Sequence, residues 1–260
     1  MTKASKTLPL AEASRIWNLY GFKAPEEMVL EDLAMAMNIF VVDAHLDSSA
    51  ARLVRKGDYG LIRVSDQIRY SGQRRFAIAH EIGHFQLHKK VSQLLACTDA
   101  DMQASYRSSL YEIEASIFAG ALLMPAEVFR ERVGRQLPRA KVIKDLAQQF
   151  DTSLTATALR YVETSKDYTV FIVSEHGKIR WWRASESFDN HDLWLETRNA
   201  VPKYSAAAKY FQDGRAPDGP REVDFNDWFG EMPGIYADYV FEQVIPLPQF
   251  NQVISIIWLP

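Results

Sequence analysis

Apolar residues recur every three or four positions through most of the first two thirds of the chain, and short alternating runs follow. The first spacing predicts amphipathic helices and the second predicts half-buried strands. Helices are expected at residues 10–20, 25–37, 76–88, 111–125, 126–133, 139–150 and 154–164. Strands are expected at residues 38–42, 51–55, 61–65, 169–173, 179–183, 236–245 and 252–258. This order of elements predicts an α+β protein with a small early sheet and a β-rich C-terminal part.

A polar stretch containing Pro and Gly interrupts the strands of the C-terminal part. It runs from about Ser187 to Gly234, and residues 213–220 within it predict a loop. Large aromatic residues lie in and around this stretch, at Trp181, Trp182, Trp194, Trp228, Phe229 and Trp258. These side chains either form the core of a small β-rich domain or line a pocket for a ligand or partner.

The composition is that of an ordinary globular protein. The 260 residues are 47% hydrophobic and 24% charged, enough for a proper core and for two domains, and the net charge of −3 does not favour broad nucleic-acid binding. No run of 18 apolar residues occurs, and the first ten residues lack the apolar core of a signal peptide. Because Cys97 is the single cysteine, no internal disulfide can form. These features predict a cytoplasmic protein without membrane contact.

The helix expected at 76–88 contains two histidines four residues apart, with a glutamate directly after the first. This spacing places His80 and His84 on one side of the helix, where both imidazoles can bind one metal ion. Glu81 can then hold a water molecule against the metal and take its proton as the water attacks a peptide carbonyl. The apolar neighbours favour a metal site over an ordinary exposed helix, because burying these polar groups without a cation is costly.

A catalytic zinc site needs a third protein ligand and one position for water. The next apolar helix opens with two acids, Glu112 and Glu114. Residues two apart on a helix point in different directions, so only one of them can face the metal. The other is expected to be a solvated or helix-start charge.

Two extended motifs surround these residues: Arg75-Phe76-x-x-Ala79-His80-Glu81-x-Gly83-His84 and Glu112-x-x-Ala115-x-x-Phe118-Ala119-x-x-Leu122-Leu123-Met124-Pro125. Together they resemble the ImmA/IrrE family of metallopeptidases, which cleave helix-turn-helix repressors. The resemblance implies a zincin-like fold, a bound Zn2+ (with Mn2+ or Fe2+ as alternatives) and Glu112 as the third ligand. It also implies a helix-turn-helix repressor protein as substrate, cleaved to derepress stress-response or mobile-element genes.

One position departs from the pattern of the family. Its members usually carry Asn or Asp four residues after the ligand glutamate, able to orient a metal-bound histidine, whereas this chain has Ser116. A hydroxyl can still accept a hydrogen bond from an imidazole, but it raises the basicity of the ligand less than a carboxylate does. A lower metal affinity than in relatives is therefore expected.

Three parts are predicted from the motifs and the order of elements. Residues 1–125 are expected to form a zincin-like metallopeptidase domain, and residues 126–166 a helical, helix-turn-helix-like segment. Residues 167–260 are expected to form a C-terminal α+β domain. Some members of the family carry a sensor-like domain at this place.

Further residues near the motifs are candidates for supporting roles. His88 continues the histidine spacing, but eight residues span about 12 Å of helix, so it cannot share a metal with His80. It is interpreted as structural, with polarisation of the substrate carbonyl as the alternative. Tyr106 and Tyr111 are further candidates for stabilising the oxyanion, and the sequence does not select one.

Two other features have a structural and a functional interpretation. Arg74 and Arg75 precede the motif helix and are expected to be solvated or to bind a neighbouring acid, rather than a substrate carboxyl group. The strand around Arg63 either pairs with an extended substrate backbone or serves only as structural support.

The sequence thus predicts a zinc-dependent endopeptidase with Glu81 as the general base. The alternative is a transcriptional regulator that binds DNA through residues 139–163 and holds a structural metal. Only Arg160 is placed to read bases and little positive charge accompanies it, so direct nucleic-acid binding is not expected. A third possibility is a binding protein that has lost turnover, and the intact Glu81 argues against it.

Overall fold

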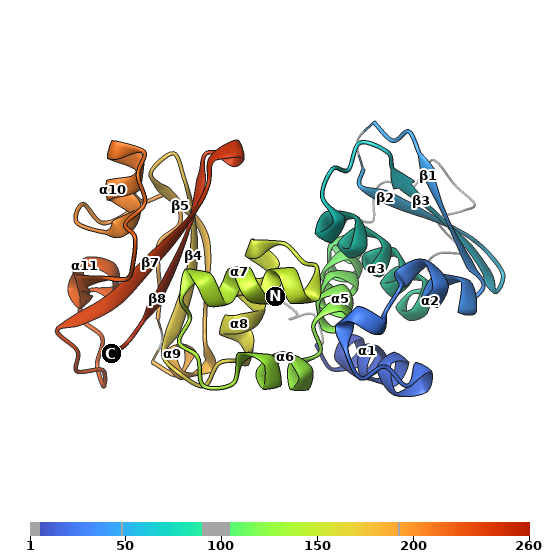
Figure 1. Cartoon of the computed structure of the whole chain (residues 1–260), viewed down its shortest axis with the longest axis horizontal. Helices are drawn as coiled ribbons and strands as arrows, with labels where there is room; N and C mark the ends of the chain where they lie inside the picture. The colour runs from blue at the N-terminus through green and yellow to red at the C-terminus, as the bar shows by residue number, and fades with distance from the viewer. Residues whose placement is uncertain (1–5, 48, 90–104, 192) are drawn as a thin grey trace. The chain divides into compact units, whose positions relative to one another are not determined.

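A computed structural model describes residues 6–47, 49–89, 105–191 and 193–260 of the chain, and Cys97 lies outside these ranges (Figure 1). Contacts divide the chain into two units. The N-terminal unit comprises Met1–Val128 and Gln148–Ser153, and the C-terminal unit comprises Phe129–Ala147 and Leu154–Pro260. None of the described helices combines the length and the apolar character that crossing a bilayer requires.

The N-terminal unit contains helices on one side of a three-stranded sheet (Figure 1). Its elements are α1 (Thr7–Tyr20), η1 (Pro25–Glu27), α2 (Leu30–Ala36), β1 (Ile39–Ala44), β2 (Ala51–Lys56), β3 (Tyr59–Ser65), α3 (Ser71–Leu87) and α5 (Ser105–Leu123). The prediction of one continuous helix over 25–37 is wrong. The backbone is extended at Met28 and Val29, which places the Met28 side chain in the core and separates η1 from α2.

The sheet of the N-terminal unit has the strand order β1-β3-β2. The predicted hairpin is present, because β2 pairs with β3 in antiparallel fashion, and β1 pairs with β3 in parallel. Both edges of β3 are therefore occupied, so the strand around Arg63 cannot pair with a substrate, and that interpretation is wrong. The strand predicted at 38–42 is also only half-buried: Ile39 faces the core, whereas Phe40 and Val42 are exposed.

The helices α3 and α5 pack closely at a glycine. A Cβ atom on Gly83 would lie 2.9 Å from Cδ1 of Phe118 and 3.2 Å from Cα of Ala115, so only glycine allows this approach. On the same helix α5, the carbonyl of Leu122 accepts a hydrogen bond from Nε1 of Trp17 in α1 at 2.8 Å. These contacts fix α5 beside the helix that carries the histidine motif.

The C-terminal unit is built on a five-stranded antiparallel sheet with the strand order β5-β4-β8-β7-β6. Its elements, with those of the junction, are α6 (Ala126–Val133), α7 (Ala140–Phe150), α8 (Leu154–Thr164), β4 (Thr169–Glu175), β5 (Lys178–Ala184), α9 (Glu186–Asp189), α10 (Ala206–Asp213), β6 (Arg221–Asp224), α11 (Phe225–Phe229), β7 (Tyr239–Leu247), η2 (Pro248–Phe250) and β8 (Gln252–Trp258). The polar stretch 187–234 thus contains three helices or parts of helices and one strand. Alanines of α10 and aromatic residues of α11 pack in the core of the unit.

A buried carboxylate connects α10 and α11 to this sheet. Glu242 on β7 accepts hydrogen bonds from the backbone N–H groups of Ala206 and Ala207 at 2.8 and 3.1 Å. It also accepts from Trp228 Nε1 at 3.2 Å and from Ser255 Oγ at 2.9 Å. Burial raises the pKa of Glu242, and these four donors oppose that shift. The carboxylate therefore positions two short elements that the hydrophobic pattern does not reveal.

Candidate metal centre

Two histidines from α3 and one glutamate from α5 converge at the surface of the N-terminal unit. Nε2 of His80 lies 3.1 Å from Nε2 of His84. The carboxylate of Glu112 reaches both rings, with Oε2 3.0 Å from Nε2 of His80 and Oε1 3.2 Å from Nε2 of His84. The structure therefore brings together the three residues that were predicted to hold a metal ion.

The geometry and protonation of these three groups fit Zn2+. Ligands bound tetrahedrally at about 2.0–2.1 Å lie roughly 3.3 Å apart, close to the distances observed here. Burial lowers the pKa of both histidines, that of His84 to about 4, so both imidazoles are neutral at pH 7, the form that binds metals. The Glu112 side chain is 60% exposed, which leaves the site open to solvent on that side.

Glu81 lies between the histidines on α3 and is mostly buried. Burial raises the pKa of its carboxyl group to about 7, and the nearby Glu112 carboxylate adds to this shift. The backbone N–H of Leu53 and the charge of Arg52, both on β2, act in the opposite direction. A carboxyl group with this pKa exchanges protons near neutral pH, as a general base requires.

His88 and Glu114 extend the site into the protein. Nδ1 of His88 lies 3.0 Å from Nδ1 of His84, and Nε2 of His88 lies 3.0 Å from Oε2 of Glu114. A carboxylate can only accept, so the N–H at Nε2 of His88 donates a hydrogen bond to Glu114; in that tautomer Nδ1 of His88 accepts a hydrogen bond from the N–H at Nδ1 of His84. Nε2 of His84 is then left with a lone pair directed at Glu112 and His80.

This arrangement revises two expectations. Glu114 is not a solvated or helix-start charge, because its carboxylate is mostly buried and binds His88. His88 is buried, as a structural residue would be, but it contacts a predicted metal ligand directly. The eight-residue spacing argued only that His88 and His80 are too far apart to share a metal ion. It could not predict that Nδ1 of His88 lies next to Nδ1 of His84.

The remaining candidates are placed as follows. Oγ of Ser116 lies 3.4 Å from Nδ1 of His80, in position to accept its N–H. The ring of Tyr111 packs on His88, with 4.7 Å between ring centroids, and the side chain of Tyr106 lies outside what the structure describes. Arg74 binds Glu31 and Asp43 at 2.7 and 2.9 Å, as expected of an arginine that binds neighbouring acids.

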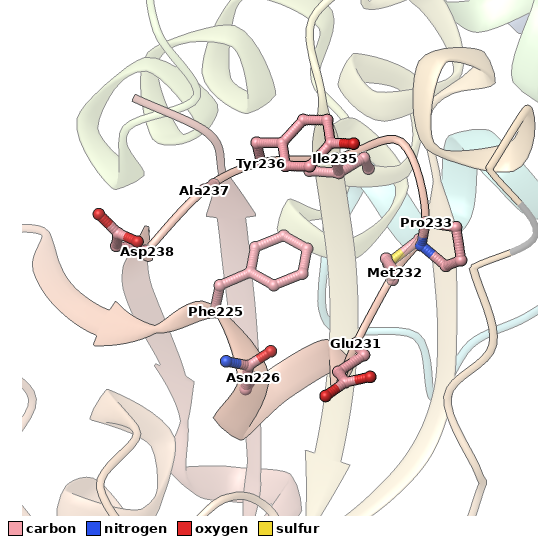
Figure 2. A pocket seen from close by; sticks show the side chains of 9 residues that line it. All are labelled: Phe225, Asn226, Glu231, Met232, Pro233, Ile235, Tyr236, Ala237 and Asp238. Atoms are coloured by element: carbon pink, nitrogen blue, oxygen red, sulfur yellow. The ribbon is translucent and has the colours of Figure 1, made fainter.

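The C-terminal unit contains a pocket of about 660 Å3, and none of the candidate site residues lines it. Figure 2 shows the segment from Glu231 to Asp238 running around Phe225 and Asn226. The lining contains no histidine or cysteine, and none of the tryptophans proposed for a ligand pocket takes part. Trp228 and Trp258 are instead buried in the unit, in agreement with a role in the core, whereas Trp194 is exposed.

The fold and the site together define an α+β protein with a HEXXH motif whose candidate metal site is completed by a glutamate from a second helix. Residues 34–161 match the model of the IrrE N-terminal-like domain, Peptidase M78, and this part of the chain belongs to that family. A relative, the radiation response metalloprotease IrrE of Deinococcus deserti, is 28% identical over 116 residues. The match covers 45% of this chain and 41% of that protein, so it spans less than half of the relative.

A solved structure shares the fold over nearly the whole chain. It is that of a Mycobacterium tuberculosis transcriptional regulator, with a TM-score of 0.63 and 18% sequence identity. The likeness covers 96% of this chain and 75% of the other. At this identity it supports a common architecture and carries no information on activity.

Proposed function

We propose that this protein is a zinc-dependent endopeptidase of the cytoplasm that cleaves a helix-turn-helix repressor and thereby derepresses transcription. The convergence of His80, His84 and Glu112 beside Glu81 is the observation that carries this proposal. The family of residues 34–161 and the metalloprotease named as a relative support the peptidase activity. The nature of the substrate is supported only by the resemblance of the two motifs to the ImmA/IrrE family.

The residues of the site have separate roles in this reaction. His80, His84 and Glu112 hold the metal, and bound Zn2+ would supply an acidified water molecule and polarise the scissile carbonyl. Glu81 takes a proton from that water and later donates it to the amine nitrogen of the leaving peptide. Its pKa of about 7 in the metal-free protein allows it to act in both directions near neutral pH.

We propose that the substrate backbone pairs with the outer edge of β2, which no other strand of the described residues occupies. This strand lies at the edge of the sheet, packs against α3, and contributes Leu53 and Arg52 to the surroundings of Glu81. An extended peptide added to an exposed edge gains main-chain hydrogen bonds and is held straight for cleavage. This role replaces the one that the sequence suggested for the strand around Arg63.

The decisive experiment combines metal analysis with cleavage of a defined substrate. The purified chain and its Glu81→Gln variant are analysed for bound metal and, where a helix-turn-helix protein is encoded beside the gene, incubated with that protein. We expect zinc in both proteins and cleavage only by the unsubstituted chain, because glutamine cannot accept a proton. Cleavage by the variant would contradict the role of Glu81, and absence of metal from both proteins would contradict the site.

The alternative, DNA binding through residues 139–163, is weakened by the position of Arg160. This residue is only 9% exposed, and its guanidinium group lies 3.5 Å from the carboxylate of Glu163 on the same helix. An arginine that reads bases must instead reach out of the protein surface. Glu81→Gln would leave a DNA-binding function unchanged, so the experiment above separates the two proposals.

A further inference from the structure

The sheet of the N-terminal unit has one face that the described helices do not cover. Strand residues alternate between faces, and the residues that point away from α2 and α3 include Phe40 and Val42 on β1, Val54 on β2 and Tyr59 on β3. Their exposed fractions are 57%, 43%, 49% and 62%. Phe40 and Val54 both lie opposite Leu61, so one apolar row crosses all three strands. A contiguous exposed patch of this kind marks an interaction site.

Positive charge accompanies this apolar row. Arg63 on the central strand lies directly opposite Arg52 on β2, and Lys56 lies opposite Tyr59 at the end of the same face. Like charges placed opposite each other destabilise a sheet. Asp43 is the only acid in the three strands. It lies one residue after Val42 on β1, so it points to the opposite face of the sheet, and it binds Arg74 at 2.9 Å. Among the described residues, no carboxylate forms an ion pair with Arg52, Arg63 or Lys56.

The dimensions of the face suit an α-helix. Neighbouring strands are about 4.8 Å apart, so three strands give a surface about 10 Å across, close to the diameter of a helix. Aliphatic side chains such as Val42, Val54 and Leu61 fill the space between the side chains of a helix. The face also carries two exposed rings, Phe40 and Tyr59, on which bases can stack, so the binding test must separate a helix from single-stranded nucleic acid.

We propose that this face binds an acidic amphipathic helix of the protein substrate, outside the segment that is cleaved. Apolar side chains of that helix cover the row formed by Phe40, Leu61 and Val54, and carboxylates along one flank pair with Arg63 and Lys56. The inference rests on the proposed function, because it assigns the helix to the substrate of the peptidase. Since β2 contributes both to this face and to the surroundings of Glu81, a docked helix raises the concentration of the adjoining peptide at the site.

The first test measures binding without turnover. The zinc-loaded full chain with Glu81→Gln is titrated with a fluorescein-labelled 18-residue peptide that has leucines at helical spacing and glutamates along one flank. We expect saturable binding that weakens about tenfold when Arg63→Glu and Lys56→Glu are added, because each reversal replaces an attraction by a repulsion. Arg221→Glu is the matched control, since it reverses an exposed arginine on a strand of the C-terminal sheet. Phe40→Thr should also weaken binding, and it tests the face without any change of charge.

Three results would overturn the docking face. The first is equal affinity of the peptide for the reversal and control variants, both shown by circular dichroism to be folded. The second is equal binding of a peptide with lysines in place of the glutamates. The third is preferred binding of a single-stranded oligonucleotide, which would assign the face to nucleic acid instead.

The second test uses cleavage. With the intact repressor as substrate, the pair Arg63→Glu and Lys56→Glu should raise KM about tenfold and leave kcat unchanged, because docking contributes to binding alone. Cleavage of a ten-residue peptide that spans the scissile bond should be the same in both proteins. An unchanged KM would overturn the docking face. If the unsubstituted chain cleaves neither substrate, the proposed function fails. The binding titration still tests whether the face binds an acidic helix.

Discussion

At the scale of single residues, the site depends on which ring nitrogens carry hydrogen. One nitrogen of His88 lies 3.0 Å from the Glu114 carboxylate and the other lies 3.0 Å from Nδ1 of His84, which favours the tautomer in which Glu114 accepts from His88 and His88 accepts from His84. A metal-binding histidine held in this way by a more distant acceptor has a fixed ring orientation and a more basic ligand nitrogen. For His80, the described residues offer the Ser116 hydroxyl, at 3.4 Å, for the same purpose. The two metal-facing histidines are therefore supported unequally.

We predict that His88→Phe weakens zinc binding by about tenfold to a hundredfold, because phenylalanine fills the space without accepting from His84. Competition with a chromophoric chelator measures the affinity, and 15N NMR of the histidine rings reports the tautomer of His84 directly. Tyr111→Phe is the control, since it retains the ring that packs on His88. An affinity of His88→Phe equal to that of the control would show that His84 needs no such support.

The raised pKa of Glu81 predicts a pH-dependent stability of the metal-free protein. The pKa rises from 4.5 to about 7 on folding, so the favourable contribution of the protonated carboxyl is complete below pH 4.5 and is lost as the pH rises through 7. We therefore expect Glu81→Gln to stabilise the metal-free protein above pH 7, by at most about 3 kcal/mol, and to have a small effect at pH 4.5. Denaturant unfolding of both proteins with chelator present, at pH 4.5 and 8, measures the difference. A difference that does not depend on pH would contradict the buried, protonated state.

At the scale of elements, the site depends on the close approach of α3 and α5. The histidines belong to one helix and Glu112 belongs to the other, so the distance between the helices sets the geometry of the metal site. Gly83 lies at the point of closest approach. A second glycine, Gly120 on α5, has no atom within 4 Å of the position that a Cβ would take.

We predict opposite effects of alanine at these two glycines. Gly83→Ala should destabilise the protein and weaken zinc binding, because overpacking costs about 1–3 kcal/mol and exceeds the gain of about 1 kcal/mol in helix propensity. Gly120→Ala should keep that gain and leave zinc binding unchanged. Thermal unfolding and chelator competition on both variants check the expectation. Equal stability of the two variants would show that the helices separate without cost.

The sequence predicted where most helices and strands lie, but, hairpins apart, it did not predict which strands pair with each other. Periodicity predicts the β2–β3 hairpin and strand β8, because both depend on residues close together in the chain. It does not predict the parallel pairing of β1 with β3, since an alternating pattern identifies the buried face and not the partner strand. The short helix α10 was missed because its buried residues are three consecutive alanines rather than large apolar side chains, and because its position depends on the distant Glu242.

The grouping of His80, His84 and Glu112 was predictable for a different reason. The spacing of His80 and His84 follows from the geometry of one helix, and the choice of Glu112 followed from family resemblance. The contact between His88 and Glu114 was not predictable, because it requires the relative rotation of two helices that are joined through residues outside the described ranges.

At the scale of the whole molecule, the chain passes between its two units more than once. Residues Gln148–Ser153 belong to the N-terminal unit, although the segments on both sides belong to the C-terminal unit. Within that short segment, Asp151 accepts a hydrogen bond from Ser71 at 2.5 Å and lies 3.7 Å from Arg75. Ser71 and Arg75 form the first turns of α3, so residues distant in sequence support the start of the helix that carries the histidine motif.

We predict that Asp151→Ala destabilises the N-terminal unit by about 1 kcal/mol and lowers the temperature at which it releases zinc, because Ser71 loses its acceptor. Asp151→Asn is the matched control. Asparagine tolerates the positive φ of 46° at this position and its amide oxygen still accepts from Ser71. Calorimetry of both variants with and without chelator measures the effect, and identical unfolding of the two would contradict it.

The hydrogen bond from Trp17 to the carbonyl of Leu122 makes this indole a spectroscopic probe of α5. All other tryptophans of the chain lie at position 181 or later, so this indole is the only one in the N-terminal unit. Its N–H is bound to α5 ten residues beyond Glu112, nearly three helical turns along the same rigid element. Fluorine-19 NMR of a 5-fluorotryptophan sample would show one resonance for each of the six tryptophans, and the Trp17 resonance, assigned with a Trp17→Phe variant, would follow the movement of α5 as zinc or substrate is added.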